Sequence, residues 1–245
     1  MAAQPRAAWA WLVLAAMALL ARPVAWLQWP AARSPWRGRA ALRAGGVAAG
    51  RSELVTNRMC PFAQKAWVAL EESGLPFSLT EISLYGAGGK PEWFMKLNPK
   101  GEIPVLIKDS GGAVVDSEAI LDWVEKEVPG MAPEDPAAGA AFRRCISARV
   151  APAGKSRVIR GGGSVGDDLD KALVELNELL KASPGSFAAG DRFSVADAAA
   201  VPFVQRLDER YGLPEEAVAL RHWWELVRGR PGVARTLQRS WWWWW

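Results

Sequence analysis

The fold of this chain is constrained most by a strand, a Cys-Pro pair and a helix that follow one another within residues 53–70. Residues 53–56 are typical of a short strand, and apolar residues recur at helical spacing from Phe62 to Leu70. Pro61 stands where the first helical turn begins, a position that suits its fixed φ angle and its missing N–H. The pattern therefore predicts an α/β unit with Cys60 at the N-cap of its first helix.

Cys60 is predicted to be a reactive thiol. At a helix N-cap, unpaired backbone N–H groups and the positive end of the helix dipole face the sulfur. That environment is expected to lower the pKa of the thiol and to favour the nucleophilic thiolate. The alternative is a small buried cysteine that only packs. We favour the reactive thiol because the strand, the Cys-Pro-aromatic segment and the amphipathic helix occur together.

The residue at position 63 indicates which redox chemistry Cys60 can perform. A dithiol centre needs Cys-x-x-Cys, so that a second thiol can resolve a mixed disulfide. Here that position is Ala63. A disulfide formed at Cys60 must therefore be resolved by an outside thiol, for which glutathione is the obvious supplier.

Composition excludes several other classes of protein. The 245 residues carry a net charge of +4, but residues 1–50 hold six arginines and no acidic residue, so the remainder has a net charge of −2. The basic character is thus no argument for nucleic-acid binding. Two cysteines are too few for a disulfide framework, and a single histidine, His222, leaves no visible metal site or catalytic triad. We expect no metal cofactor.

Residues 1–50 are predicted to be a targeting leader. Residues 7–20 form an apolar run of suitable length for the apolar core of a signal sequence, and residues 31–50 are rich in Ala, Arg and Gly without acidic residues. This order resembles the two-part leaders that direct proteins into plastids bounded by extra membranes. Secretion, another organelle or an uncleaved membrane anchor are the alternatives.

Residues 51–129 are predicted to form one α/β domain. After the first strand and helix, the patterns indicate strands at 77–82, 103–107 and 113–116. They also indicate a short helix that begins with residues 91–95 and stops at Asn98-Pro99, and a helix at 117–127. The order βαβ followed by αββα matches a thioredoxin-like domain.

Residues 130–240 contain no convincing strand and are predicted to form an all-helical domain. Helices are expected at 137–150, 167–181, 198–207 and 220–228, with a loop across 152–166. Ser194 and Asp197 have the spacing of a capping box, and Cys145 is expected to pack within its helix. A tail of five tryptophans, residues 241–245, follows.

Two further segments are candidates for ligand contacts. The bond between Ile103 and Pro104 could be cis, which would turn the backbone of Ile103 toward the thiol, or trans, with Pro104 only opening an edge strand. Asp116 and Ser117 stand where a strand ends and a helix begins. They could bind the ammonium and carboxylate of an α-amino acid, or they could simply cap the helix.

These residues together resemble the cysteine-type glutathione transferases, with the omega class nearest and the lambda and dehydroascorbate reductase classes close to it. The resemblance covers about residues 52–240. It rests on four segments in the same order, namely Cys-Pro-Phe-Ala-Gln from Cys60, Lys-Pro-Glu-Trp-Phe from Lys90, Ile-Pro-Val-Leu from Ile103, and Asp116-Ser117. It implies a thioredoxin-like domain followed by an all-α domain.

The resemblance also implies roles for individual residues. Cys60 would be the nucleophile and would form a mixed disulfide with glutathione, while Phe62 would shape the pocket. Lys90 would contact the glycyl carboxylate side. The backbone of Ile103, before a cis Pro104, would pair with the cysteinyl unit. The γ-glutamyl end would be bound by Asp116 and Ser117. Met59 departs from the aromatic residue common before the cysteine, and Asp116 is one methylene shorter than the usual Glu.

The expected function is a glutathione-dependent thiol transferase or dehydroascorbate reductase that needs no metal. Conjugation of glutathione to electrophiles is a weaker alternative, because that chemistry uses a Ser or Tyr hydroxyl where this chain has Cys60. A non-catalytic ligand-binding or membrane-associating protein is the third reading. The expected partners are glutathione and a small or glutathionylated substrate, but no nucleic acid; a homodimer is left open, and membrane contact is expected only through an uncleaved leader.

Overall fold

The computed structural model describes residues 51–84, 89–160 and 165–237. The predicted leader at 1–50, the glycines at 161–163 and the tryptophan tail lie outside the described residues. Targeting to a plastid therefore stays a prediction. The domain bounds 51–129 and 130–240 also stay predictions. Among the helices of the described residues, none has both the length and the apolar character that a membrane span needs.

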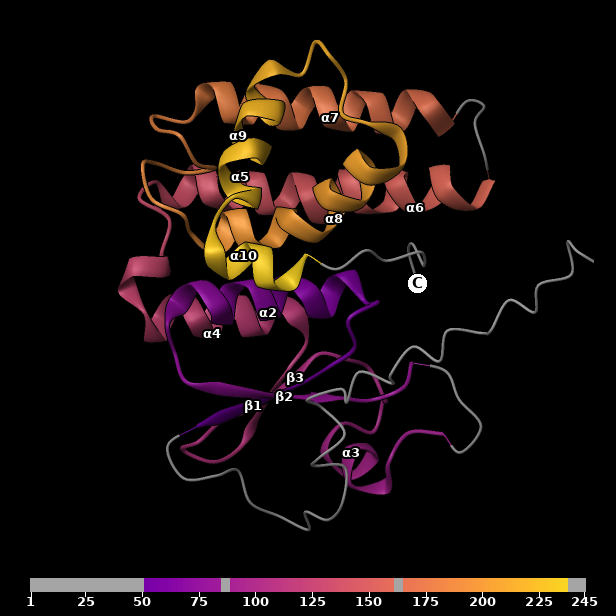
Figure 1. The fold of residues 1–245 in the computed structure, drawn as a ribbon, viewed down its shortest axis with the longest axis vertical. Helices are drawn as coiled ribbons and strands as arrows, with labels where there is room; N and C mark the ends of the chain where they lie inside the picture. Colours follow the sequence, from indigo (N-terminus) through magenta and orange to yellow (C-terminus); the bar gives the residue numbers. More distant parts are fainter. Residues whose placement is uncertain (1–50, 85–88, 161–164, 238–245) are drawn as a thin grey trace, which may run out of the picture. The chain divides into compact units, whose positions relative to one another are not determined.

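The first half of the described chain is an α/β domain built on one sheet (Figure 1). The sheet has the strand order β2-β1-β3-β4, with β1 parallel to β2 and antiparallel to β3, and with β3 antiparallel to β4. Its elements are β1 (Ser52–Thr56), α2 (Pro61–Ser73), β2 (Phe77–Glu81), α3 (Glu92–Leu97), β3 (Val105–Ile107), β4 (Ala113–Val115) and α4 (Ser117–Glu127). The predicted thioredoxin-like topology is confirmed.

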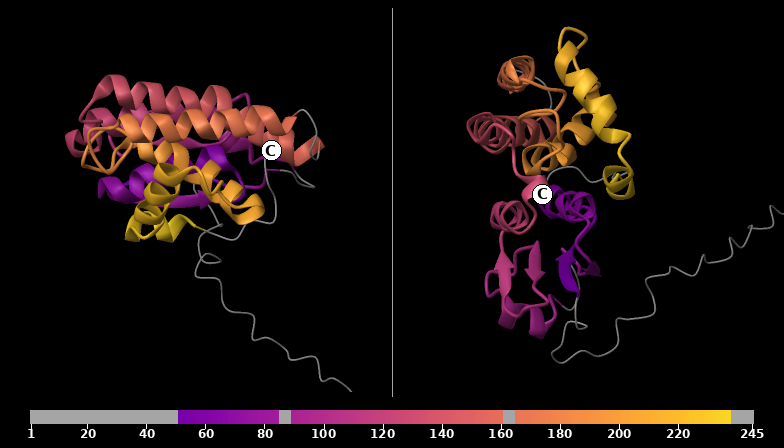
Figure 2. Two further views of the ribbon diagram at one scale, coloured as in Figure 1. Left: turned by 90° about the horizontal axis from the view of Figure 1, so that it is seen from above. Right: turned by 90° about the vertical axis from the view of Figure 1, so that its left-hand side faces the viewer.

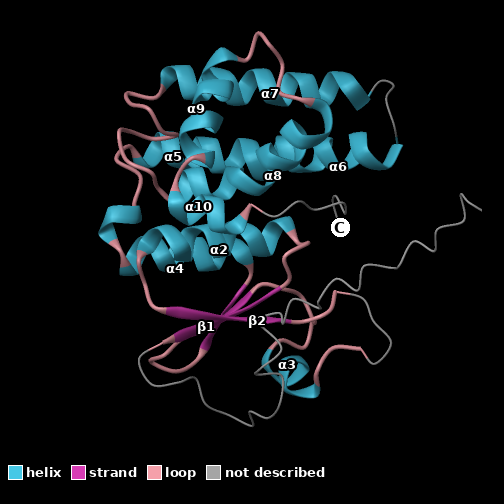
Figure 3. Cartoon of the chain, in the orientation of Figure 1, coloured by secondary structure: helices cyan, strands magenta, loops and turns pink. Residues whose placement is uncertain are grey.

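The alternation of side chains along the strands gives the sheet two apolar faces. Leu54 and Leu106 belong to the main core, which α2 and α4 cover. Val55 and Val105 point the other way and contact Phe94 of α3 in a smaller cluster. Figure 3 shows α3 on the opposite side of the strands from α2 and α4.

The second half of the described chain is helical. It contains a 3₁₀ turn (Pro129–Met131), α5 (Pro136–Cys145), a π-helical turn (Ile146–Val150), α6 (Ala151–Arg160), α7 (Val165–Ala182), α8 (Val195–Tyr211), α9 (Val218–Arg228) and α10 (Pro231–Thr236). Helices α8 and α10 pack against α2 and join the two halves, as the two further views show (Figure 2). The capping box at Ser194 and Asp197 is present, and Asp197 also accepts a hydrogen bond from Trp223 Nε1 at 2.8 Å.

Two predicted boundaries need correction, and one helix was not predicted. The loop expected from residue 152 is wrong, because α6 continues through Arg160. Pro152 comes just after the π-helical turn that joins α5 to α6 without a break, so the proline does not end the helix. The strand expected from Ile103 begins only at Val105, after Pro104. Helix α10 was not expected, and its six residues are too short to show a helical period.

Candidate active site

The strand register brings the sequence-predicted site residues to one end of the sheet. Strand β1 ends at Thr56, four residues before Cys60, and Val55 pairs with Val105. Val105 in turn pairs with Val115. The segments that continue from these three positions, which contain Cys60, Ile103-Pro104 and Asp116-Ser117, therefore leave the sheet at the same end.

The loop before Cys60 is held by the side chain of Asn57, which is buried. Its Oδ1 accepts the Met59 N–H at 3.0 Å, and its Nδ2 donates to the Ile82 carbonyl at 2.8 Å. The Cys60 N–H donates to the Asn57 carbonyl at 3.0 Å, and the Cys60 carbonyl accepts the Gln64 N–H at 2.9 Å. Cys60 is thus fixed as the N-cap of α2, as predicted, with Pro61 at the first helical position.

The electrostatics of Cys60 differ from the expectation. Its side chain belongs to the core, with only 5% of the residue exposed, and this burial raises the pKa of the thiol above its ordinary value. The backbone N–H groups of Ala63 and Phe62 lower the pKa, as do the charges of Arg206 and Lys65, but together they do not offset burial. The predicted net lowering of the Cys60 pKa is therefore wrong. The N–H groups of the helix lower this pKa as expected, but desolvation of the buried thiol raises it by more.

The peptide bond between Ile103 and Pro104 is cis. The residues before it are tied to Lys90, whose Nζ donates to the Gly101 carbonyl. Asn98 also supports this segment, because its Nδ2 donates to the Glu102 carbonyl at 2.7 Å. Lys90, which precedes α3, therefore contacts the segment after α3 that leads to Ile103.

Asp116 caps helix α4, as one of its two sequence readings predicted. Its Oδ1 accepts the N–H groups of Glu118 at 2.7 Å and Ala119 at 3.4 Å. Asp116 is also the one non-glycine residue with a positive φ in the described chain, at 85°. Such backbone conformations are costly and concentrate at ligand clamps and active sites. Ser117, directly after it, is buried.

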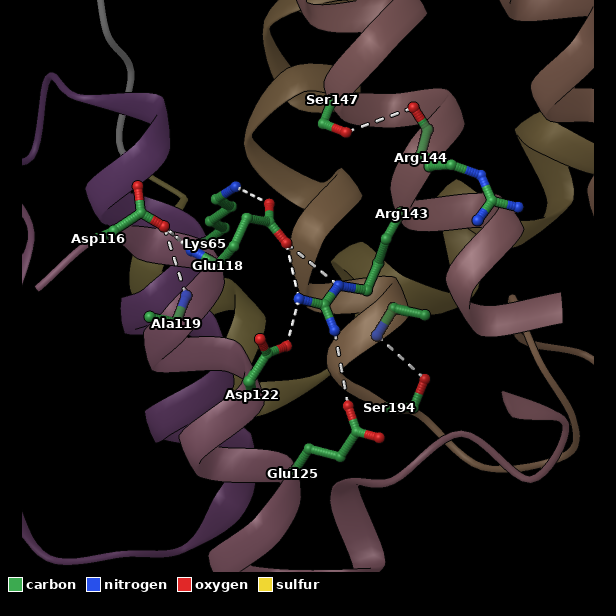
Figure 4. Close-up of polar contacts among 11 residues, drawn as sticks. Lys65, Asp116, Glu118, Ala119, Asp122, Glu125, Arg143, Arg144, Ser147 and Ser194 are labelled. Atoms are coloured by element: carbon green, nitrogen blue, oxygen red, sulfur yellow. Dashed lines mark hydrogen bonds and ion pairs between the residues drawn. The ribbon is translucent and has the colours of Figure 1, made fainter. Parts of the chain in front are cut away.

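A charged cluster lies directly behind this cap, on α2, α4 and α5 (Figure 4). The buried Lys65 Nζ donates to Glu118 Oε1, and Arg143 Nη2 of α5 donates to Glu118 Oε2 at 2.7 Å. Arg143 Nη2 also contacts Asp122 Oδ1 at 2.7 Å, and its Nη1 lies 3.6 Å from Glu125 Oε2. Burial alone would raise the pKa of Glu118, but the two cations lower it overall.

A second set of contacts between the halves lies beside Cys60. Gln64 of α2 donates to Gln205 Oε1 at 2.7 Å and to the Thr236 carbonyl at 3.2 Å. Its Oε1 accepts from Arg206 Nη1 at 2.6 Å. Phe62 packs edge-on against Phe203 of α8, with 5.5 Å between ring centroids.

Sequence reasoning missed Arg206, Gln64 and Lys65 as parts of this region. Arg206 follows Phe203 by three positions and Pro202 by four. Helical spacing alone therefore places it on the same face of α8 as these two residues, which is the buried face. That spacing is the signal that could have found it.

Comparison with known proteins agrees with this architecture. Residues 59–127 match the family model for the glutathione S-transferase N-terminal domain, and residues 147–235 match the model for its C-terminal domain. Glutathione S-transferase DHAR2 of Arabidopsis thaliana is 27% identical over 200 residues, which cover 78% of this chain and 88% of that protein. Glutathione S-transferase omega-1 of Sus scrofa is 29% identical over 208 residues, covering 80% and 85% respectively.

A solved structure extends the match to three dimensions. The crystal structure of glutathione transferase Omega 1C from Trametes versicolor superposes with a TM-score of 0.66 at 27% sequence identity, over 77% of this chain and 92% of the other. The two family models together span well over half of the chain. The chain therefore belongs to the glutathione S-transferase family and is an enzyme of its omega-like and dehydroascorbate reductase-like kind.

Proposed function

We propose that the protein is a glutathione-dependent thiol transferase that works through a mixed disulfide between Cys60 and glutathione. The observation that carries this proposal is a lone cysteine at a helix N-terminus, at the end of the sheet where a cis proline and a positive-φ aspartate also lie. Omega-class and DHAR members among the relatives support it.

No resolving thiol stands next to Cys60. Ala63, where a dithiol enzyme has its second cysteine, is fully buried in the core. The other cysteine, Cys145, is buried on α5, and its Sγ lies 3.8 Å from the Ala172 carbonyl. Burial raises the pKa of Cys145 to about 11, so this thiol stays protonated at neutral pH. External glutathione must therefore complete the cycle.

The cycle has two exchanges of thiol and disulfide. The Cys60 thiolate attacks the glutathione sulfur of a glutathionylated peptide, so that a Cys60–glutathione disulfide forms and the peptide leaves as a thiolate, which takes up a proton. The thiolate of a second glutathione then attacks the sulfur of the bound glutathione. Oxidised glutathione leaves, and the Cys60 thiolate is regenerated.

The same thiol could reduce dehydroascorbate. In that case the Cys60 thiolate adds to a carbonyl carbon, and glutathione attacks the Cys60 sulfur to release ascorbate and form the same mixed disulfide. A second glutathione again gives oxidised glutathione. Two glutathione molecules supply the two electrons that dehydroascorbate takes up, so both substrates share one intermediate.

The remaining site residues are proposed to hold glutathione. Asp116 uses only Oδ1 for the helix cap, so Oδ2 is available for the ammonium of the γ-glutamyl end. Ser117 would bind the carboxylate of that end at the N-terminus of α4. The backbone of Ile103 would pair with the cysteinyl unit, and Lys90 would turn toward the glycyl carboxylate. Phe62, which is partly exposed beside Cys60, would form a wall of the pocket.

The test compares Cys60→Ser with Cys145→Ser. Each variant and the wild type are incubated with glutathione and either a glutathionylated peptide or dehydroascorbate, and formation of oxidised glutathione is followed. We expect Cys60→Ser to abolish turnover and Cys145→Ser to preserve it. Intact-mass measurement should show one reducible glutathione adduct on the wild type and on Cys145→Ser only. Turnover that persists in folded Cys60→Ser would overturn the proposal, as would the absence of turnover and adduct in the wild type.

A further inference from the structure

Arg206 is a buried cation whose partners, among the described residues, are all neutral groups. It lies on α8 with 1% of its surface exposed. Its Nη1 donates to Gln64 Oε1 at 2.6 Å and to the Pro202 carbonyl at 2.8 Å, and its Nη2 donates to the Met59 carbonyl at 3.3 Å. All three acceptors are uncharged.

The charge of Arg206 is not balanced by a carboxylate. No Asp or Glu of the described residues forms an ion pair with it, and its Nε is buried without a hydrogen-bond partner. Glu209, the acid that acts on it from the same helix, accepts a hydrogen bond from Gln205 instead. Burial of an unpaired charge is expensive, and here it lowers the pKa of Arg206 to about 10. The guanidinium is still charged at neutral pH.

One group beside Arg206 can become an anion. Cys60 directly follows Met59, whose carbonyl Arg206 binds, and Cys60 is itself buried. Attraction between the thiolate and Arg206 favours the charged form of both groups. The other cation that acts on the thiol, Lys65 of α2, already has Glu118 of α4 as its partner. Arg206 is thus the cation near the thiol whose charge is uncompensated.

We propose that Arg206 is the counter-ion of the Cys60 thiolate, so that the helical half supplies the charge that activates a thiol of the thioredoxin-like half. This inference rests on the proposed function, because it assigns Arg206 to the same thiol. The charge would act twice in each cycle. It would stabilise the Cys60 thiolate before attack, and it would stabilise the same thiolate again when glutathione displaces it from the mixed disulfide.

The test measures the thiol directly and needs no glutathione. In a Cys145→Ser background, the rate of Cys60 alkylation by iodoacetamide, a neutral reagent, is followed against pH. Below its midpoint this rate reports the thiolate fraction. We expect Arg206→Gln to slow alkylation about tenfold at neutral pH and to move the midpoint upward, since a nearby buried charge is removed. Arg206→Lys, which keeps the charge, should stay within about threefold of the parent.

Arg143→Gln is the matched control, because Arg143 is a partly buried arginine that also joins the two halves but contacts carboxylates. Its alkylation profile should coincide with that of the parent. If Arg206→Gln does not fold, Arg206→Met supplies an uncharged side chain suited to a buried site. An unchanged profile in the uncharged variant would overturn the inference, and so would an equal slowing in Arg206→Lys or Arg143→Gln. Because alkylation is independent of turnover, a failure of the transferase assay would leave this result interpretable.

Discussion

Two arginines of the helical half reach into the thioredoxin-like half, and they do so in opposite electrostatic settings. Arg143 of α5 contacts three carboxylates on α4, namely Glu118, Asp122 and Glu125. Burial alone would lower its pKa, but Glu118 and Asp122 raise it overall. Within the part of the chain that the structure describes, Arg206 of α8 donates only to an amide and two backbone carbonyls, and burial lowers its pKa to about 10. One cation is fully compensated and the other is not.

The difference indicates that the two contacts serve different purposes. A partly buried cation that is bound by several carboxylates fixes the geometry of the helix that carries them, and α4 begins at Ser117 with Asp116 as its cap. A buried cation without an anion is costly unless an anion forms during function. The contact through Arg143 therefore holds the proposed γ-glutamyl site against the helical half, whereas the contact through Arg206 serves the thiol.

The largest expected effect comes from truncating Glu118, which both cations of the first contact share. Glu118→Ala leaves Lys65, with 3% of its side chain exposed, without an anion. We expect a loss of about 2–3 kcal/mol in the free energy of unfolding by urea, below the ~3–5 kcal/mol typical of a fully buried pair because Glu118 is itself partly exposed. The double variant with Lys65→Met should recover part of the loss. A loss under about 0.5 kcal/mol would show that the cluster does not join the halves.

Acid should reproduce part of that effect. Because the folded-state pKa of Glu118 is lowered, its contribution is complete above the ordinary glutamate pKa and disappears as the pH falls through the lowered value. The effect should be smaller than truncation, since a protonated Glu118 keeps its shape and can still hydrogen-bond. Urea unfolding measured across the acidic range should show a shallower pH dependence for Glu118→Gln than for the wild type. Identical curves would contradict this assignment.

The sequence predicted the local parts of this site and missed the contacts between its halves. The N-cap at Cys60 and the capping box at Ser194 depend on neighbouring residues, and both are present. The pair formed by Gln64 and Arg206 joins residues 142 positions apart, so no local pattern contains it. The same reason explains why the sequence predicted a lowered Cys60 pKa whereas the structure has it raised. The effect of the helix N-terminus on the thiol is local, but the burial of the thiol depends on the complete fold.

A smaller effect is expected at Gln64, the amide that orients Arg206. Gln64→Ala removes an acceptor from Arg206 and a donor to Gln205 and the Thr236 carbonyl. We expect the free energy of unfolding by urea to fall by about 1–2 kcal/mol, because polar groups buried on the opposite helices lose a hydrogen-bond partner. Alkylation of Cys60 should slow less than in Arg206→Gln, since the charge is retained. A slowing as large as that of Arg206→Gln would mean that orientation matters more than charge.

The smallest effect is expected at Asp122, the most exposed carboxylate of the cluster, with 64% of its side chain accessible. Asp122→Ala leaves Arg143 its bonds to Glu118 and its contact with Glu125. Exposed ion pairs contribute little, so we expect a loss of at most about 0.5 kcal/mol in urea unfolding and an unchanged Cys60 alkylation profile. A loss near that of Glu118→Ala would show that the cluster acts as one cooperative unit. Arg143 would then depend on all of its carboxylate partners together. If the loss is small, Arg143 depends mainly on Glu118, the carboxylate that also binds Lys65.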